Sequence, residues 1–442
     1  MLRKHQGTGH RRSALRIAAI GGATLLGVGL AGCAPSGDTG GATSITFLAG
    51  GNDAASISLA NGLVDAFEKE NPDITVKVDT RPAGTDGDNL IKTQLSTGTM
   101  NDVFFYNSGS LFQALNPDST LQPLDDEPWV DDLTDDFKVT VSTDNGLYGT
   151  PWGSTFNGGV MYNKKVYEQL GLEVPDTWDE FISNSQAIKA AGIIPILQSY
   201  GDTWTSQLFV LADFANVAAA DENWADDYTN NKAKYADAPA FSAFEHTAEV
   251  NQLGLLNEDY ASLTNVDALK LLATGEAAQY PMITAVIGNV IQNNPENVDD
   301  IGYFAMPSDA GDSQATVWIS NAAYIPKSTT GAKLEAAKKF IAFINSPAGC
   351  DVQNSAAVAA GPYAISTCEV PDDAPALVAD ELAYQDAGKT SPALEFLSPV
   401  KGPNLEKILV EVGSGITPAE EGAALYDNDV KAQAQQLGLP GW

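Results

Sequence analysis

Basic residues and histidine are scarce in this sequence. Its 442 residues include 24 Lys and Arg against 57 Asp and Glu, and only three His. The net charge of −33 leaves no basic face to bind phosphates, so nucleic acid is excluded as a partner. Since 44% of the residues are hydrophobic and 18% are charged, there is ample material for a globular core, and the acidity is a property of the surface rather than a sign of disorder.

Residues that support metal or nucleophile chemistry are also few. His5 and His10 lie in the basic N-terminal segment, which leaves only His246 in the body of the chain. A multi-histidine zinc site is therefore excluded, and neither a G-x-S-x-G motif nor a 12-residue calcium loop with glycine at its sixth position is present. We predict no catalytic residue, metal or cofactor; carboxylate chemistry, as in glycoside hydrolysis, is the one enzymatic alternative left open.

The N-terminus has the pattern of an export signal. Five basic residues up to Arg16 precede the apolar run IAAIGGATLLGVGLAGC, and no acidic residue occurs before Asp38. Leu30 to Cys33 reads as a lipobox, which predicts cleavage after residue 32, lipidation of Cys33 and a tether over 33–43. Export by the Sec or the twin-arginine route stays open. Loss of 1–32 would take the net charge from −33 to −38.

Two further cysteines, Cys350 and Cys368, follow in the body of the chain. An oxidising compartment favours a loop-closing disulfide between them, and two unpaired buried thiols are the alternative.

The chain then follows an α/β pattern. Hydrophobic periodicity predicts strands over 45–48, 74–78 and 103–106, separated by helices over 57–70 and 88–97. This order indicates a mostly parallel sheet whose ligands lie beyond the carboxyl ends of its strands. A second, helix-richer α/β lobe follows, with a predicted strand over 194–197 and predicted helices over 177–191, 204–219, 239–253 and 266–274. After it come predicted strands over 301–307 and 317–326 and a predicted helix over 333–345.

Several segments resemble one known family. They are LVDAFEKENPDITVKV, LSTGTMNDVFF, YGTPWG, GGVMYNKKVYEQLGLEVPDTWDEF, TGEAAQYPM and VWISNAAYIPKST followed by AKKFIAFINSP. Their order resembles the extracellular, maltodextrin-binding-like solute-binding lipoproteins of ABC sugar importers. The resemblance implies a bilobed, periplasmic-binding-protein-like fold of type II, with a hinge crossed about three times. It places 44–150 plus 307–346 in the N-terminal lobe and 151–306 plus 347–442 in the C-terminal lobe, with crossings near Thr150, near Met306 and after Pro347.

The resemblance also implies a ligand site at strand ends and hinge loops. Aromatic faces suit sugar rings and planar polar groups suit hydroxyls. The expected ligand-binding residues are Trp204, Asp202, Trp152, Trp318, Asn52, Asp53, Asn107, Ser108, Asn321, Tyr280 and Tyr363.

Structural alternatives stay open for most of these residues. Asp202, Asn52 and Asp53 are equally suited to cap helices, and Asn107 and Ser108 to form a turn. Trp152 and Trp318 are equally suited to pack in the hinge or the core.

The function expected from the resemblance is capture of a neutral mono- or oligosaccharide by lobe closure and its delivery to an ABC permease. The protein is expected to be a monomer, lipid-anchored on the extracellular face of the cell membrane. A polyol or other non-sugar solute on the same fold is one alternative, and a secreted carbohydrate-active hydrolase or adhesin is another.

Overall fold

The structure is a computed structural model that describes residues 42–51, 54–82, 84–356 and 359–442. The predicted signal peptide, Cys33 and most of the tether lie outside the described residues, as do Asn52 and Asp53. Among the described helices, none combines the length and the apolar character that crossing a bilayer requires.

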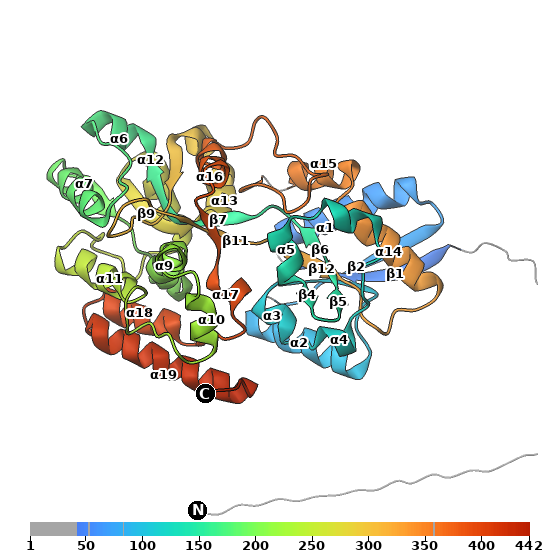
Figure 1. Cartoon of the computed structure of the whole chain (residues 1–442). Coiled ribbons are helices and arrows are strands. Elements are labelled where there is room, and N and C mark those ends of the chain that lie inside the picture. Colours follow the sequence, from blue (N-terminus) through green and yellow to red (C-terminus); the bar gives the residue numbers. More distant parts are fainter. Residues whose placement is uncertain (1–41, 52–53, 83, 357–358) are drawn as a thin grey trace, which may run out of the picture. The chain divides into compact units, whose positions relative to one another are not determined.

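The first sheet has five strands in the order β2-β1-β3-β12-β6 (Figure 1). The parallel strands are β1 (Thr43–Leu48), β2 (Ile74–Asp79) and β3 (Val103–Tyr106), as the periodicity predicts. In β2 the buried Ile74 and Val76 alternate with exposed residues, which is the pattern of a strand with one face on the core. Two strands from distant parts of the sequence complete the sheet, β12 (Asn321–Tyr324) and β6 (Gly149–Trp152), and β12 is antiparallel to β3 and to β6.

Helices from two distant parts of the sequence cover this sheet. The predicted N-terminal helices are present as α1 (Ala54–Glu70) and α2 (Gly84–Thr97). Figure 1 shows α14 (Ala332–Ile344) and α15 (Pro347–Ala356), in orange, beside the blue N-terminal segments, and α15 packs against α1.

The second sheet is built on β7 (Phe156–Asn163) and has the order β13-β11-β7-β9-β8. Strand β10 also pairs with β7, next to β11 along the same strand. Its other strands are β8 (Ile194–Ile196), β9 (Ala277–Ile283), β10 (Ile301–Phe304), β11 (Ala315–Trp318) and β13 (Thr390–Pro392). The helices of this region include α6 (Lys164–Leu170), α7 (Trp178–Ala190), α11 (Ser242–Gln252), α12 (Asn265–Thr274), α13 (Ile287–Asn293), α16 (Ala376–Asp386), α18 (Leu405–Gly413) and α19 (Ala419–Leu437).

Two predicted elements are wrong in detail. The single helix predicted over 204–219 is three short pieces, namely η2 (Thr203–Gln207), α8 (Leu208–Leu211) and α9 (Phe214–Ala220). The single strand predicted over 317–326 is split between β11 and β12, which belong to different sheets. The split arises because β11 pairs with β7 while β12 pairs with β3 and β6.

The chain crosses between the two sheets three times. The second and third crossings lie at other positions than predicted. The first crossing lies between Trp152 and Phe156, close to the expected place. The second lies between Trp318 and Asn321 rather than near Met306, because β11 keeps the preceding segment on the second sheet.

The third crossing follows Cys368 instead of Pro347. Cys350, Ile365 and Cys368 belong to the hydrophobic core of the first sheet, whereas Leu377 and Val378 belong to a core of the second. Packing of α15 on α1 holds this segment on the first sheet.

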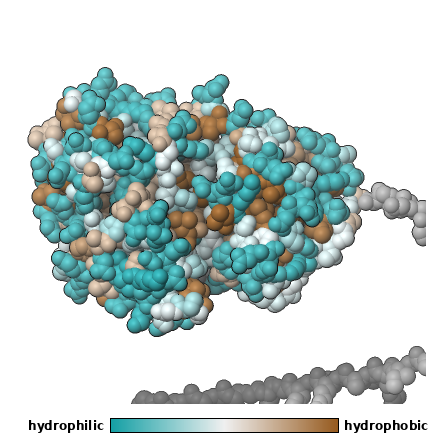
Figure 2. All heavy atoms as spheres, in the orientation of Figure 1, coloured by the Kyte–Doolittle hydropathy of each residue, from teal (hydrophilic) through white to brown (hydrophobic). Residues whose placement is uncertain are grey.

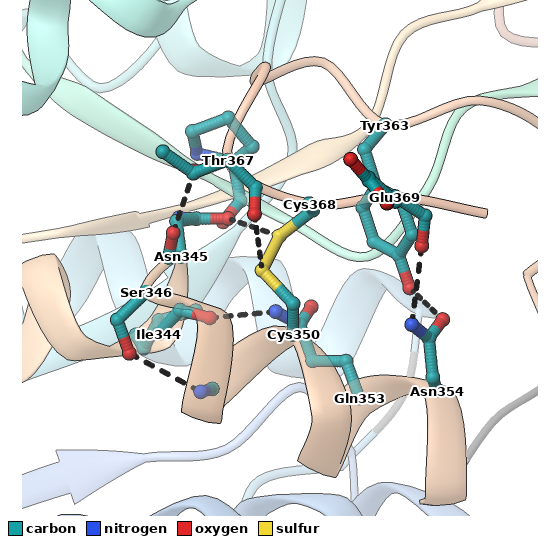
Figure 3. Close-up of a disulfide and its surroundings, with 12 residues drawn as sticks. Ile344, Asn345, Ser346, Cys350, Gln353, Asn354, Tyr363, Thr367, Cys368 and Glu369 are labelled. Atoms are coloured by element: carbon teal, nitrogen blue, oxygen red, sulfur yellow. Dashed lines mark hydrogen bonds between the residues drawn. A yellow bond between two sulfur atoms is a disulfide. The ribbon is translucent and has the colours of Figure 1, made fainter. Parts of the chain in front are cut away.

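A disulfide joins Cys350 of α15 to Cys368, as the sequence predicts (Figure 3). Side chains around it also bind the backbone: Thr367 Oγ1 donates to the carbonyl of Asn345 at 2.7 Å, and Gln353 Nε2 donates to that of Ile344, also at 2.7 Å. The disulfide therefore ties the segment that precedes the third crossing to the first sheet's core.

We expect a C350A/C368A double variant to lose about 3 kcal/mol of unfolding free energy, since a crosslink that closes a loop of this length reduces the entropy of the unfolded chain. Denaturant titration would measure this loss. Dithiothreitol should lower the stability of the wild type and leave that of the variant unchanged. Equal stability of oxidised wild type and variant would contradict the prediction.

Candidate functional site

Five of the predicted site residues gather around the first two crossings. Trp152 lies directly opposite Asn321 in the β6·β12 ladder. The hydroxyl of Ser108, which follows β3, donates to the carbonyl of Ser320 at 2.9 Å, next to Asn321. Asn107 lies beside Ser108, and its carbonyl accepts a hydrogen bond from the Tyr324 hydroxyl at 3.0 Å. We call Trp152, Trp318, Asn321, Asn107 and Ser108 the crossing group.

Aromatic rings surround Trp152. Its ring centroid lies 5.4 Å from that of Phe47 and 5.6 Å from that of Phe105. Trp152 is half-buried, so the hinge-packing alternative describes part of its role, while the rest of its surface stays accessible. Phe105 was not among the predicted site residues. The only signal for it in the sequence was its place in the predicted strand over 103–106.

Trp318 packs on the second sheet. Its ring stacks on Phe156 with centroids 6.1 Å apart and planes at 8°. A Cβ on Gly158 would lie 2.3 Å from the Trp318 ring, so glycine at this position lets the ring lie against the strand. Trp318 remains half-buried. The two crossings thus present one tryptophan from each sheet.

Two other predicted residues, Asp202 and Tyr280, contact the start of α12, and Trp204 lies near Asp202 in the sequence. Asp202 Oδ2 accepts from the backbone N–H of Asn265 at 2.7 Å, so its carboxylate caps α12. Tyr280 is fully buried, and its hydroxyl contacts Ser199 Oγ at 2.5 Å and Asn265 Nδ2 at 3.0 Å. Burial raises the pKa of Tyr280. Trp204, two residues after Asp202, is 37% exposed. We call Trp204, Asp202 and Tyr280 the helix-start group.

The members of the helix-start group differ in what they can offer a ligand. Trp204 has a free aromatic surface, whereas Asp202 and Tyr280 are engaged in holding the fold. The capping alternative for Asp202 therefore holds, although the helix that it caps is α12 and not the one that follows it in sequence.

Tyr363 lies in the segment bound to the first crossing and is counted in neither group. It forms a bridge with Ser154, and its hydroxyl donates to Asn354 Oδ1 at 2.6 Å (Figure 3). Burial raises the pKa of Tyr363 to about 12.

Two buried donors after the strands of the first sheet were not among the predicted residues. Arg81 follows β2 and is 5% exposed, and its guanidinium carbon lies 5.9 Å from the ring centroid of Tyr106 at the end of β3. Neither Arg81 Nε nor the Tyr106 hydroxyl has a hydrogen-bond partner among the described residues. Burial lowers the pKa of Arg81 and raises that of Tyr106. The sequence signal that could have identified them is their position at the carboxyl ends of parallel strands, where ligands of such sheets bind.

A separate pocket of about 380 Å³ lies on the helices of the second sheet. It is lined by Asp213, which is buried, and by His246, whose Nε2 lies 2.9 Å from Asp309 Oδ1. The His246 ring stacks on Trp178 with centroids 3.7 Å apart. Burial raises the pKa of Asp213 to about 7. Across the described part of the chain, no three His, Cys, Asp or Glu side chains are grouped to hold a metal ion.

Hydrophilic residues predominate on the face shown in Figure 2, where hydrophobic residues form small patches. This distribution agrees with the acidic composition of the chain.

Comparison with known proteins identifies relatives at the level of family. The family described as bacterial extracellular solute-binding protein matches residues 52–349. The multiple sugar-binding protein of Streptococcus mutans is 25% identical over 73% of this chain and 76% of its own length. The melibiose/raffinose/stachyose-binding protein MelE of Bacillus subtilis is 25% identical over 65% of this chain and 66% of its own length.

Solved structures share the fold. A binding protein from Bacillus subtilis named MsmE, in an open conformation, aligns with a TM-score of 0.75 and 20% identity over 90% of this chain and 99% of its own. A chitin oligosaccharide binding protein aligns with a TM-score of 0.75 and 22% identity over 90% and 100%. The protein RafE in complex with raffinose aligns with a TM-score of 0.70 and 19% identity over 89% and 99%.

The buried carboxyl of Asp213 predicts a pH dependence of stability. Its pKa in the folded protein lies above that of an unfolded Asp. Its contribution to the stability of the fold is therefore fully present below about pH 4 and is lost as the pH rises through about 7. We therefore expect the stability of the wild type, relative to Asp213→Asn, to fall by about 3 kcal/mol between pH 5 and pH 8.

Urea denaturation of both proteins at these two pH values would measure this change. Asp226→Asn, which removes an exposed carboxylate, serves as the matched control and should differ from the wild type by a constant amount. A pH-independent difference for Asp213→Asn would contradict the prediction.

Proposed function

We propose, from the premise that this chain belongs to the bacterial extracellular solute-binding protein family, that it captures a neutral mono- or oligosaccharide and delivers it to an ABC permease. The observation that carries the proposal is the crossing group. It brings Trp152 of the first sheet and Trp318 of the second to adjacent crossings, together with the amide of Asn321.

The chemistry of these side chains suits a sugar. The C–H faces of a pyranose ring pack on an aromatic face, which buries a large area at little entropic cost. Hydroxyl groups need planar donors and acceptors, which Asn321 and Asn107 can supply. Arg81 Nε and the Tyr106 hydroxyl add two donors that lack partners within the described structure.

Closure of the two lobes supplies the signal to the permease. Short crossing segments can absorb the φ/ψ changes of a hinge, and closure removes the ligand from water. A sugar that binds the closed form more tightly shifts the population toward it, so the permease can distinguish loaded from empty receptor. This mechanism breaks no covalent bond, and a receptor rather than a hydrolase is the function that we propose.

The names of the relatives support an oligosaccharide ligand. The MelE protein is named for melibiose, raffinose and stachyose, and a solved neighbour is in complex with raffinose. An acidic chain with a net charge of −33 favours a neutral ligand over an anionic one, because its field repels anions.

Placement outside the cell membrane completes the proposal. We propose that cleavage leaves Cys33 lipidated and that the tether holds a monomeric receptor close to the permease. Repulsion between the acidic body and anionic headgroups would keep that body off the lipid surface.

We expect the variants Trp318→Ala and Trp204→Ala to show whether the crossing group or the helix-start group stacks on the sugar. Loss of a buried aromatic anchor commonly costs more than about 2 kcal/mol, so the affinity of the variant that removes the anchor should fall more than tenfold. Isothermal titration calorimetry with melibiose, raffinose and stachyose would measure it, with chromatography of the incubated sugar to detect any product.

The control is Trp442→Phe, which alters a tryptophan that binds the carbonyl of Thr229. It should leave the affinity unchanged. Absence of heat from every saccharide with the wild type would refute the sugar proposal, and unchanged affinity in both folded alanine variants would refute the stacking site.

A further inference from the structure

A second pocket, of about 210 Å³, lies where the crossings meet. Thr155 and Asn157 line it from the first crossing, Val317 and Ile319 from the second, and Tyr363 from the segment that leads to the third. We call it the hinge pocket. Thr155 also binds the carbonyl of Pro362 through both its backbone N–H and its hydroxyl, at 2.8 Å each, so the wall of this pocket is held together across the hinge.

The hinge pocket lies on the opposite face of the strands from the aromatic pair. Asn157 and Val317 are opposite each other in the β7·β11 ladder, as are their neighbours Phe156 and Trp318. Successive side chains of a strand point to opposite faces. Since Asn157 and Val317 line the pocket, a ligand there would not compete with a sugar stacked on Trp318.

Glu381 of α16 contributes a buried carboxyl to the hinge pocket. It is 1% exposed, and neither carboxyl oxygen has a hydrogen-bond partner among the described residues. A Cβ on Gly361 would lie 2.7 Å from Glu381 Oε2, so glycine there leaves room for the carboxyl. A carboxylate enclosed in this way is costly unless it is neutralised by a proton or by a cation.

The groups around Glu381 do not supply that positive charge. The nearest acidic neighbour on α16, Asp380, binds Lys164 at 3.1 Å and so occupies that lysine. The facing elements add polar but uncharged groups, namely Tyr303 of β10, Thr284 after β9 and Asn157 of β7. Burial, followed by the effect of Asp380, raises the pKa of Glu381 well above its ordinary value.

We propose that the hinge pocket binds a small organic cation, whose ammonium group pairs with the carboxylate of Glu381. A metal ion is the less suitable occupant, because no group of three metal-binding side chains occurs in the described residues. Val317, Ile319 and the ring of Tyr363 provide apolar surface for the carbon chain of an amine, and an aromatic ring also attracts a cation. Asp135 and Asp136 at the same pocket strengthen the negative potential.

Proton release is the signature of this binding mode. In the proposed binding mode, the ammonium replaces a proton on the buried Glu381 carboxyl, so one proton leaves to solvent for each cation bound. The affinity should therefore rise about tenfold for each unit that the pH increases, as long as the pH stays below the pKa of Glu381 and below that of the amine.

Calorimetric titration of the full chain with propylammonium chloride tests the proposal, in the absence of sugar and against sodium chloride at equal ionic strength. Titrations in phosphate and in HEPES, which have different ionisation enthalpies, should report one proton released per cation. We expect Glu381→Gln to bind at least tenfold more weakly and to release no proton. Asp386→Asn, which removes an exposed carboxylate from the same helix, should bind like the wild type.

If Glu381→Gln does not fold, Glu381→Asp keeps the charge but shortens the side chain, and it should also bind at least tenfold more weakly. Absence of binding to the wild type, equal heat from sodium chloride, or full binding by a folded Glu381 variant would overturn the proposal. The experiment contains no saccharide, so failure here would leave the proposed sugar binding standing.

Discussion

The structure depends above all on two antiparallel ladders that end within a few residues of each other. The β6·β12 ladder belongs to the first sheet and the β7·β11 ladder to the second, with only Ile319 and Ser320 between β11 and β12. Backbone hydrogen bonds hold each ladder in register, so Trp152 lies opposite Asn321 and Phe156 opposite Trp318. Any movement of one sheet against the other has to be absorbed by the short segments between the ladders. The same segments bear the aromatic residues on one face and the hinge pocket on the other.

Burial rather than residue type decides which acidic side chains of this chain have a raised pKa. Most of the 57 Asp and Glu are solvated, but Asp213 and Glu381 are enclosed among helices and strands of the second sheet. Asp213 retains a partner, since Asn216 Nδ2 donates to its Oδ1 at 2.8 Å, whereas Glu381 has none in the described structure. Desolvation raises the pKa of both. An acidic composition keeps the surface hydrated. It does not indicate which carboxyl groups are buried away from water.

Local pattern was sufficient for elements that bury one regular face. The sequence predicted almost to their ends the strands over 74–78 and 103–106 and the helix over 177–191. The side chain of Thr177 accepts a hydrogen bond from the backbone N–H of Glu180 in a capping box, as its position before an apolar helix suggests. The segment 204–219 was not predictable in this way. Its residues are buried on several sides, so the helical spacing of apolar residues hides two interruptions. The apolar run at 317–326 likewise has the pattern of one strand, although its halves pair with different sheets.

Sequence alone indicated the α/β class and favoured the pairing of Cys350 with Cys368, because these follow from periodicity, composition and residue chemistry. It also supplied the family resemblance that the match over 52–349 bears out. The candidate tryptophans came from the family resemblance. Only the tertiary structure decided that Tyr280 is a buried structural hydroxyl, that Asp202 caps α12 and that Glu381 lies in the hinge pocket without a partner among the described residues. Asp202 and Asn265 are 63 positions apart and Ser199 and Tyr280 are 81 positions apart, and no local pattern records which distant segment will remove a side chain from water.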